Sequence, residues 1–179
     1  MEKVLLHCCC GPCSTASIET LKNLGYAVVL FFGNSNIYPQ SEHAKRLENL
    51  KKVATYFDLE VITGEYNHGA WLQQITGYEN EREGGKRCNL CFEFNLKEAA
   101  YVAANHDIAY FTTTLTVSPH KSSPLIFKIG EKWSQFLAVD FKKKGGFHRS
   151  IELSKILELY RQDYCGCEFS KRERAKRVP

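Results

Sequence analysis

The alternation of short apolar runs with segments of helical periodicity constrains the fold of this chain more than any other feature. Residues 3–6 and 26–32 are rich in β-branched, aromatic and leucine side chains, which is typical of strands. Between them, residues 14–25 carry apolar side chains at helical spacing and end on Gly25, a residue that favours a helix C-terminus. The alternation continues, with strands expected at 59–63, 108–114 and 137–141 and helices at 41–57, 89–104, 123–136 and 149–160. The pattern predicts an α/β fold, a doubly wound, Rossmann-like parallel sheet of about five strands with helices on both faces.

The length and composition predict a single domain in the cytoplasm. The chain has 179 residues and a hydrophobic fraction of 44%, ordinary values for one soluble domain. No apolar run approaches the roughly 18 residues of a membrane span, and the first residues lack the apolar stretch of a signal peptide. We therefore expect a cytoplasmic protein with no membrane partner, with a domain at 1–170 and a basic tail at 171–179.

Eight cysteines fall into three clusters, and their spacing predicts a metal site. The sequence CCCGPC at 8–13 lies between the first predicted strand and the first predicted helix, where open α/β sheets bind their ligands. A C-x-x-C pair follows at 88–91 and a C-x-C pair at 165–167. Structural disulfides are rare in a reducing cytoplasm, so three cysteine clusters that converge on one sheet edge indicate metal binding.

The residues alone leave several kinds of site open. Cys10 and Cys13 match a thioredoxin-like C-G-P-C tetrapeptide, but a thiol–disulfide oxidoreductase needs only that pair and leaves the other clusters unexplained. Four thiolates would suit structural zinc in a non-catalytic RNA-binding module. The surplus of cysteines favours an iron–sulfur cluster, which takes four thiolates and leaves others for a second metal or for chemistry. An ATP-using tRNA sulfur-transfer enzyme would want a phosphate-binding Gly/Ser loop where this chain has cysteines.

Six ordered motifs resemble one enzyme family. They are LLHCCCGPCS (5–14), FFGNSNIYP (31–39), ENEREGGKRCNLCFEFNL (79–96), YFTTTLTVSPHKS (110–122), DFKKKGGFHRSIELSK (140–155) and LYRQDYCGCEFS (159–170). Together they resemble the cobalamin-independent epoxyqueuosine reductases of the QueH type, which complete queuosine at the wobble position of tRNA. The resemblance implies a fold related to the nucleotide α-hydrolase-like Rossmann proteins. Two positions depart from the family pattern: NSNIYP replaces the usual Asn-Pro-Asn-Ile-His-Pro, and Cys8 stands at a small variable position, so we expect that Cys8 is not a ligand.

The resemblance also implies a reaction and its cofactors. The reaction removes the epoxide oxygen from a cyclopentane ring, leaves an alkene and releases water, with two electrons from an external donor and without cobalamin. The family is implied to carry a [4Fe–4S] cluster with an adjacent mononuclear iron. Within this chain we assign Cys9, Cys10, Cys88 and Cys91 to the cluster, and Cys13, Cys165, Cys167 and Asp140 to the second metal.

Protons and the tRNA substrate require further residues. We expect His7, at the end of the first strand, and His120, in the SPHK segment, to supply protons. Clustered basic side chains neutralise phosphates, and those expected to contact tRNA that carries epoxyqueuosine are Lys86, Arg87, Lys142, Lys143, Lys144 and Arg149. The net charge of +4 is a mild excess that does not by itself establish RNA binding.

Overall fold

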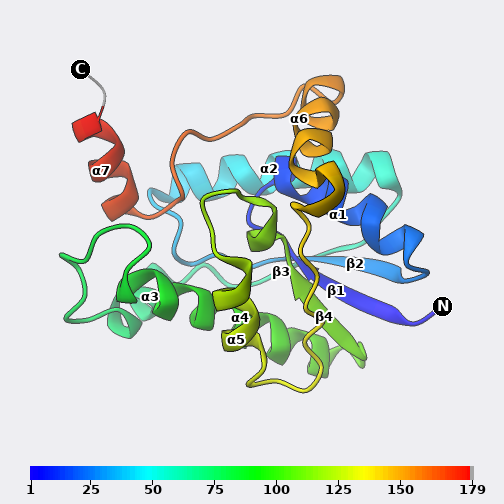
Figure 1. Cartoon of the computed structure of the whole chain (residues 1–179), viewed down its shortest axis with the longest axis horizontal. Helices are drawn as coiled ribbons and strands as arrows, with labels where there is room; N and C mark the ends of the chain where they lie inside the picture. The colour runs from blue at the N-terminus through cyan, green and yellow to red at the C-terminus, as the bar shows by residue number, and fades with distance from the viewer. Residues whose placement is uncertain (178–179) are drawn as a thin grey trace.

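A four-stranded parallel sheet in the order β3-β2-β1-β4 forms the centre of the molecule (Figure 1). The computed structural model describes the backbone of residues 1–177 and the side chains of residues 1–176. The strands are β1 (Lys3–His7), β2 (Ala27–Phe32), β3 (Val61–Thr63) and β4 (Tyr110–Thr113). β1 pairs with both β2 and β4, so that Leu5 lies opposite Val29 on one side and Phe111 on the other. The predicted α/β fold with a parallel sheet is confirmed.

Helices cover both faces of this sheet (Figure 1). α1 (Gly11–Asn23), α2 (Gln40–Phe57) and α6 (Gly146–Ile156) lie on one face, and α4 (Lys86–Asn105) and α5 (Ser123–Gly130) lie on the other. Two further helices, α3 (His68–Gln74) and α7 (Glu168–Arg177), lie at the end of the molecule opposite the N-terminus. Short 3₁₀ turns at Thr114–Val117 and Lys143–Gly145 follow β4 and precede α6. No helix among residues 1–177 is long and apolar enough to cross a membrane.

The strand side chains alternate between two cores. Leu6 and Leu30 pack with α1 and α2, whereas Leu5 and Phe31 pack with α4, and all four are fully buried. A strand that is covered on both faces needs apolar side chains at successive positions, which explains the unbroken apolar runs in the sequence. Packing in these two cores holds the sheet in place, and the loops that leave the sheet form the candidate site.

The predicted fifth strand at 137–141 does not form. Phe111 and Phe136 make one isolated parallel bridge beside β4. Further along, the hydroxyl of Thr116 donates a hydrogen bond to the carbonyl oxygen of Val139 at 2.9 Å. A side chain therefore satisfies a backbone group that a neighbouring strand would otherwise bind, and the segment passes β4 without extending the sheet.

Some helix bounds also differ from the prediction. The helix expected at 123–136 ends at Gly130, and Phe136 folds back against this helix end, where a Cβ at Gly130 would overlap its ring. α6 occupies 146–156 instead of 149–160. α3 and α7 carry too little apolar periodicity for the sequence to predict them. The expected domain boundary at residue 170 falls inside α7.

Candidate metal centre

The turn between β1 and α1 brings three thiols together. Cys10 caps the start of α1, and its sulfur accepts a hydrogen bond from the backbone amide of Cys13 at 3.5 Å. Gly11 lies against α2, since a Cβ at this position would be 2.8 Å from the carbonyl oxygen of Asn49. The sulfur atoms of Cys9, Cys10 and Cys13 all lie within 4.8 Å of one another. The packing of α1 on α2 thus fixes a compact group of three sulfur ligands.

Cys10 is the thiol of this group that ionises most readily. Hydrogen bonds from Cys13 and Cys9 hold the pKa of Cys10 well below its usual range, and the positive charge of Arg46 acts in the same direction. The interaction with Cys10 raises the pKa of both Cys9 and Cys13. The start of a helix also favours a negative charge. The protein alone therefore stabilises one thiolate at this turn, and a bound cation would favour ionisation of the other two.

The start of α4 supplies two more thiols. Cys88 and Cys91 lie three residues apart in the sequence and therefore face the same side of the helix. The sulfur of Cys88 accepts a hydrogen bond from the amide of Gly84 at 3.2 Å, and the sulfur of Cys91 lies 3.6 Å from Nδ2 of Asn95. The polar segment before α4 thus leads into a helix that presents a C-x-x-C pair.

The loop between α6 and α7 supplies the last pair. Arg46 of α2, only 1% exposed, donates hydrogen bonds to the carbonyl oxygens of Cys165 at 2.9 Å and Tyr164 at 3.3 Å. Gly166, between the two cysteines, has a φ of +151°, and a Cβ there would lie 3.3 Å from Nη1 of Arg46. A buried guanidinium and a glycine together hold the C-x-C loop against α2.

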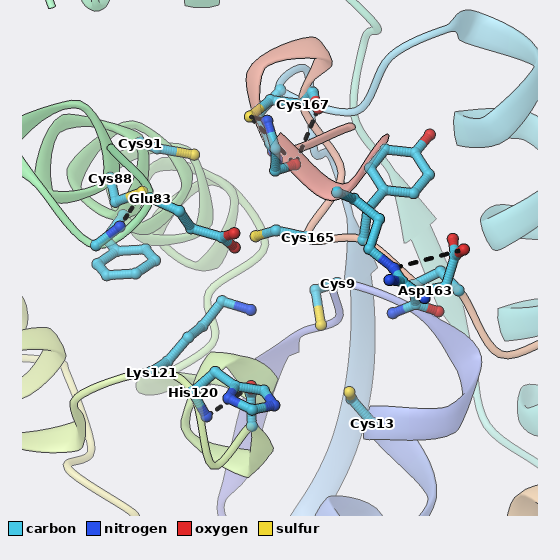
Figure 2. Close-up of a pocket in the computed structure, with 18 of the residues that line it drawn as sticks. Cys9, Cys13, Glu83, Cys88, Cys91, His120, Lys121, Asp163, Cys165 and Cys167 are labelled. Atoms are coloured by element: carbon cyan, nitrogen blue, oxygen red, sulfur yellow. Dashed lines mark hydrogen bonds and ion pairs between the residues drawn. The ribbon is translucent and has the colours of Figure 1, made fainter. Parts of the chain in front are cut away.

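These three parts of the chain enclose one cavity of about 560 Å³. The cysteines that line it are Cys9, Cys13, Cys88, Cys91, Cys165 and Cys167. Figure 2 shows these side chains gathered around one space, with Cys91 and Cys165 extending into it from different elements. Thr114, directly after β4, also lines the cavity. The three cysteine clusters converge at the carboxyl end of the sheet, as the sequence predicted.

The α4 and C-terminal thiols affect one another's ionisation. Burial raises the pKa of Cys88 to about 11 and raises the pKa of Cys91 well above its usual range, and the nearby Cys165 and Cys167 raise both further. Thiols that resist joint ionisation become thiolates when a cation compensates their charge. The donor set, which consists of free thiols from three parts of the chain, therefore fits a metal centre.

Cys8 points away from this cavity. Its thiol is fully buried and donates a hydrogen bond to the carbonyl oxygen of Leu6 at 3.1 Å. Burial raises the pKa of this thiol far above its usual range. The expectation that Cys8 is not a ligand stays a prediction, and the position of Cys8 in the core agrees with it.

His7 lies behind the cysteine turn. It is fully buried, its Nδ1 lies 2.9 Å from the hydroxyl of Thr113, and its Nε2 lies 3.0 Å from Oδ1 of Asn34. Burial lowers the pKa of the imidazole. His7 does not line the cavity, and both ring nitrogens are engaged by the protein. The structure therefore does not support the prediction that His7 gives a proton to a substrate, and places the ring where it braces the ends of β1 and β4.

His120 lies at the cavity, and its neighbour Lys121 reaches further in. His120 is exposed and lines the cavity, so its predicted role as a proton donor stays a prediction. Lys121 extends its ammonium into the space between Cys9 and Cys165 (Figure 2). Burial lowers the pKa of Lys121, but the proximity of Cys165, Cys9, Cys13 and Cys10 raises it by more, because each of these groups attracts the ammonium when it is ionised. The sequence analysis did not identify Lys121, because histidine is the side chain whose unperturbed pKa lies near neutral pH and the candidate proton donors were therefore histidines.

Asp140 lies outside the cavity. Its carboxylate accepts a hydrogen bond from the hydroxyl of Ser123 at 2.9 Å and lies 3.6 Å from the ammonium of Lys142. This position does not support the prediction that Asp140 binds the second metal. The carboxylates that line the cavity belong instead to Glu83 and Asp163 (Figure 2).

Three of the basic residues predicted to bind tRNA are engaged within the protein. Arg87 is 2% exposed and forms an ion pair with Glu173, a position that does not support its predicted contact with RNA. Lys142 donates a hydrogen bond to a backbone carbonyl and forms an ion pair with Asp140, and Arg149 binds the carboxylate of Glu19 at 2.8 Å. The remaining predicted residues are exposed: Lys86, Lys143 and Lys144.

The chain is similar to named epoxyqueuosine reductases over almost its whole length. A family model described as Epoxyqueuosine reductase QueH matches residues 4–173. The epoxyqueuosine reductase QueH of Thermotoga maritima is 39% identical over 185 residues, which cover 99% of this chain and 94% of that protein. The proteins of the same name from Streptococcus pyogenes and Dehalococcoides mccartyi are each 35% identical, over 93% and 96% of this chain and 69% and 94% of their own length.

Two solved structures share the fold at low identity. The U34-tRNA thiolase NcsA from Methanococcus maripaludis, solved with its [4Fe-4S] cluster, has a TM-score of 0.62 at 12% identity and covers 98% of this chain and 64% of its own. A predicted subunit of a tRNA methyltransferase from Methanocaldococcus jannaschii has a TM-score of 0.59 at 15% identity and covers 85% of this chain and 75% of its own. The family model and the Thermotoga maritima relative each match nearly the whole chain, and this chain belongs to the epoxyqueuosine reductase QueH family.

Proposed function

We propose that this chain reduces epoxyqueuosine to queuosine in tRNA, in the cytoplasm and without cobalamin. One observation carries the proposal: in a chain of this family, thiols from three distant parts of the sequence meet in one cavity at the carboxyl end of the sheet. The reaction breaks both carbon–oxygen bonds of an epoxide, forms a carbon–carbon double bond and releases water. It takes up two electrons from an external donor and two protons.

We further propose that the cavity holds a [4Fe–4S] cluster with an adjacent metal ion. Four thiolates are typical of such a cluster, and this cavity offers more than four. When bound, the cluster would supply electrons, and the adjacent metal would act as a Lewis acid toward the epoxide oxygen. The cavity volume of about 560 Å³ lies within the range of small-molecule sites, about 300–1,000 Å³. The same cavity thus suits both metal ligands and an extruded nucleoside.

We propose a division of the cysteines between the cluster and the adjacent metal, and the distances between sulfur atoms bear on this division. Sequence spacing assigns Cys13 to the second metal, whereas its sulfur lies within 4.8 Å of those of Cys9 and Cys10, the two cysteines assigned to the cluster. The distances favour one ligand group of these three and a second group of the α4 and C-terminal thiols. Iron and sulfide analysis of single Cys→Ser variants tests both divisions, because a cluster ligand and a ligand of the adjacent metal lower different metal counts.

The exposed basic residues are proposed to bind the anticodon arm. Lys86 directly precedes Arg87 and Cys88, which line the cavity, and its ammonium lies 5.9 Å from the centre of the Tyr78 ring. Lys143 and Lys144 lie in the turn before α6 and have no ion pair among the described residues. Such side chains neutralise phosphates and orient RNA without reading its sequence.

The decisive experiment combines metal analysis with a direct assay. Protein purified without oxygen is analysed for iron, zinc and sulfide, and then incubated with a low-potential reductant and tRNA that carries epoxyqueuosine. We expect a brown protein with about four irons and four sulfides or more, and conversion of the nucleoside to queuosine by mass spectrometry. A colourless protein that stays folded with one zinc would instead favour a non-catalytic RNA-binding module.

A further inference from the structure

Lys121 occupies a place in the cavity that the metal ligands do not explain. Its backbone is held from both sides: its amide donates to the carbonyl oxygen of Ser118 at 3.2 Å, and its carbonyl oxygen accepts a hydrogen bond from Lys142 at 3.0 Å. The side chain leaves this fixed turn and extends toward Cys9 and Cys165 (Figure 2). The ammonium is therefore carried into the cavity by a braced loop.

Among residues 1–176, Lys121 is the lysine or arginine lining this cavity whose ammonium forms no hydrogen bond or ion pair with an oxygen acceptor. The Lys and Arg side chains that line the cavity are Arg87, Lys121, Arg161 and Arg174. Arg87 pairs with Glu173, Arg161 donates to the hydroxyl of Ser154 at 3.0 Å, and Arg174 lies 4.0 Å from Asp163. Among residues 1–176, the groups that interact electrostatically with the Lys121 ammonium are the thiols Cys165, Cys9, Cys13 and Cys10. A half-buried ammonium with free donors is poised for an acceptor that arrives with the substrate.

The reaction supplies such an acceptor at one atom. As the first carbon–oxygen bond of the epoxide breaks, negative charge develops on the oxygen, which must then leave as water. The thiols of the cavity are the proposed metal ligands, and Glu83 and Asp163 are carboxylates that would repel this charge, which leaves Lys121 to act on the oxygen together with the proposed adjacent metal. A fixed cation with hydrogen-bond donors, inside a cavity, is the kind of group that stabilises a developing oxyanion.

We propose that Lys121 binds the epoxide oxygen of the substrate and stabilises the negative charge that this oxygen gains as the ring opens. The inference rests on the proposed epoxyqueuosine reductase function and adds a contact residue to it. Two electrons from the external reductant and two protons from solvent balance the step: both carbon–oxygen bonds break, one carbon–carbon double bond forms and one water leaves. Lys121 acts by hydrogen bonding and charge.

The test compares Lys121→Met and Lys121→Arg with Lys128→Met, an exposed lysine of α5 that does not line the cavity. Iron and sulfide content, single-turnover rate with saturating epoxyqueuosine-tRNA, and affinity for epoxyqueuosine-tRNA and for queuosine-tRNA are measured for each. Queuosine lacks the oxygen, so its tRNA reports every contact except the proposed one. The wild-type rate on epoxyqueuosine-tRNA tests the proposed function separately, because a wild-type protein without activity would refute the function before any variant is compared.

We expect Lys121→Met to keep the iron and sulfide content and the affinity for queuosine-tRNA. Its preference for epoxyqueuosine-tRNA over queuosine-tRNA should fall by about tenfold, since a charged hydrogen bond is lost. Its single-turnover rate should fall by about a hundredfold or more, as when an oxyanion donor is removed. Lys121→Arg, which keeps the charge, should recover part of both losses, and Lys128→Met should match the wild type.

Two results would overturn the inference. A Lys121→Met variant that loses iron in proportion to its loss of rate would show that Lys121 supports the metal centre. A variant that keeps both the wild-type rate and the wild-type preference for the epoxide would show that Lys121 does not contact the oxygen.

Discussion

Replacement of the buried Arg46 is the most direct test of how the C-terminal cysteines are held. Arg46 connects α2 to the loop that carries Cys165 and Cys167, and it pairs with Glu42 at 2.7 Å. Methionine fills a similar volume and makes none of these interactions. We therefore expect Arg46→Met to destabilise the fold and to release the C-x-C loop from α2.

The expected cost follows from the contacts that are lost. Arg46→Met leaves two backbone carbonyls and the carboxylate of Glu42 without their charged donor, and breaking a buried pair costs about 3–5 kcal/mol. Glu42 keeps a hydrogen bond from the hydroxyl of Tyr160 at 3.1 Å, and its side chain is 11% exposed. These remaining interactions reduce the penalty, so we expect about 3 kcal/mol.

Urea unfolding of the reduced, metal-free protein measures this cost. With a urea dependence of about 2 kcal/mol per M, the midpoint of Arg46→Met should fall by about 1.5 M. Arg46→Lys keeps the charge beside Glu42 but loses the forked geometry of the guanidinium, so its urea midpoint should lie between those of the wild type and Arg46→Met. Arg149→Met is the matched control, because Arg149 is an exposed arginine with two surface pairs, and its midpoint should hardly change.

Metal analysis then connects stability to the site. Arg46→Met purified without oxygen should contain less iron than the wild type, since two cysteines lose their support. A midpoint within about 0.5 M of the wild type, together with full iron content, would refute the argument that Arg46 holds this loop.

Four further predictions address other residues. Burial raises the pKa of Glu98 from 4.5 to about 7, so its ionisation lowers the stability of the fold as pH rises through this window. The free energy of unfolding of Glu98→Gln, measured in urea, should exceed that of the wild type by about 1–2 kcal/mol at pH 8, after allowance for partial exposure. At pH 4.5 the two should be equal. An equal gain at both pH values would contradict this. Gly166→Ala should lower iron content, because its φ of +151° strains any other residue, and normal iron would count against it. Cys8→Ala should keep the wild-type iron content, and a loss would make Cys8 a ligand. Alanine at Lys143 and Lys144 should weaken tRNA binding and flatten its dependence on salt in filter-binding assays; unchanged affinity would exclude this patch.

The sequence by itself determined the fold class and the chemistry of the site. Strand and helix periodicities are local properties, and the unbroken apolar run at 26–32 already specifies a strand that is covered on both faces. The connection from β1 to α1 must lie at the carboxyl end of the sheet, so the position of Cys9, Cys10 and Cys13 also followed from element order. Cysteine number and spacing indicated metal without any knowledge of contacts.

Only the tertiary structure decided which charged and polar residues are free to act. Arg87 is a basic residue beside a C-x-x-C motif, but in the fold it is buried and forms an ion pair with Glu173, which is distant in sequence. Arg46 lies on a helix whose sequence gives no reason to connect it with Cys165, 119 residues away. Lys121 became a candidate because each of the other arginines that line the cavity has a hydrogen-bond or ion-pair partner. The partners of Arg87 and Arg46 come from distant segments, and such pairing depends on packing that no local periodicity encodes.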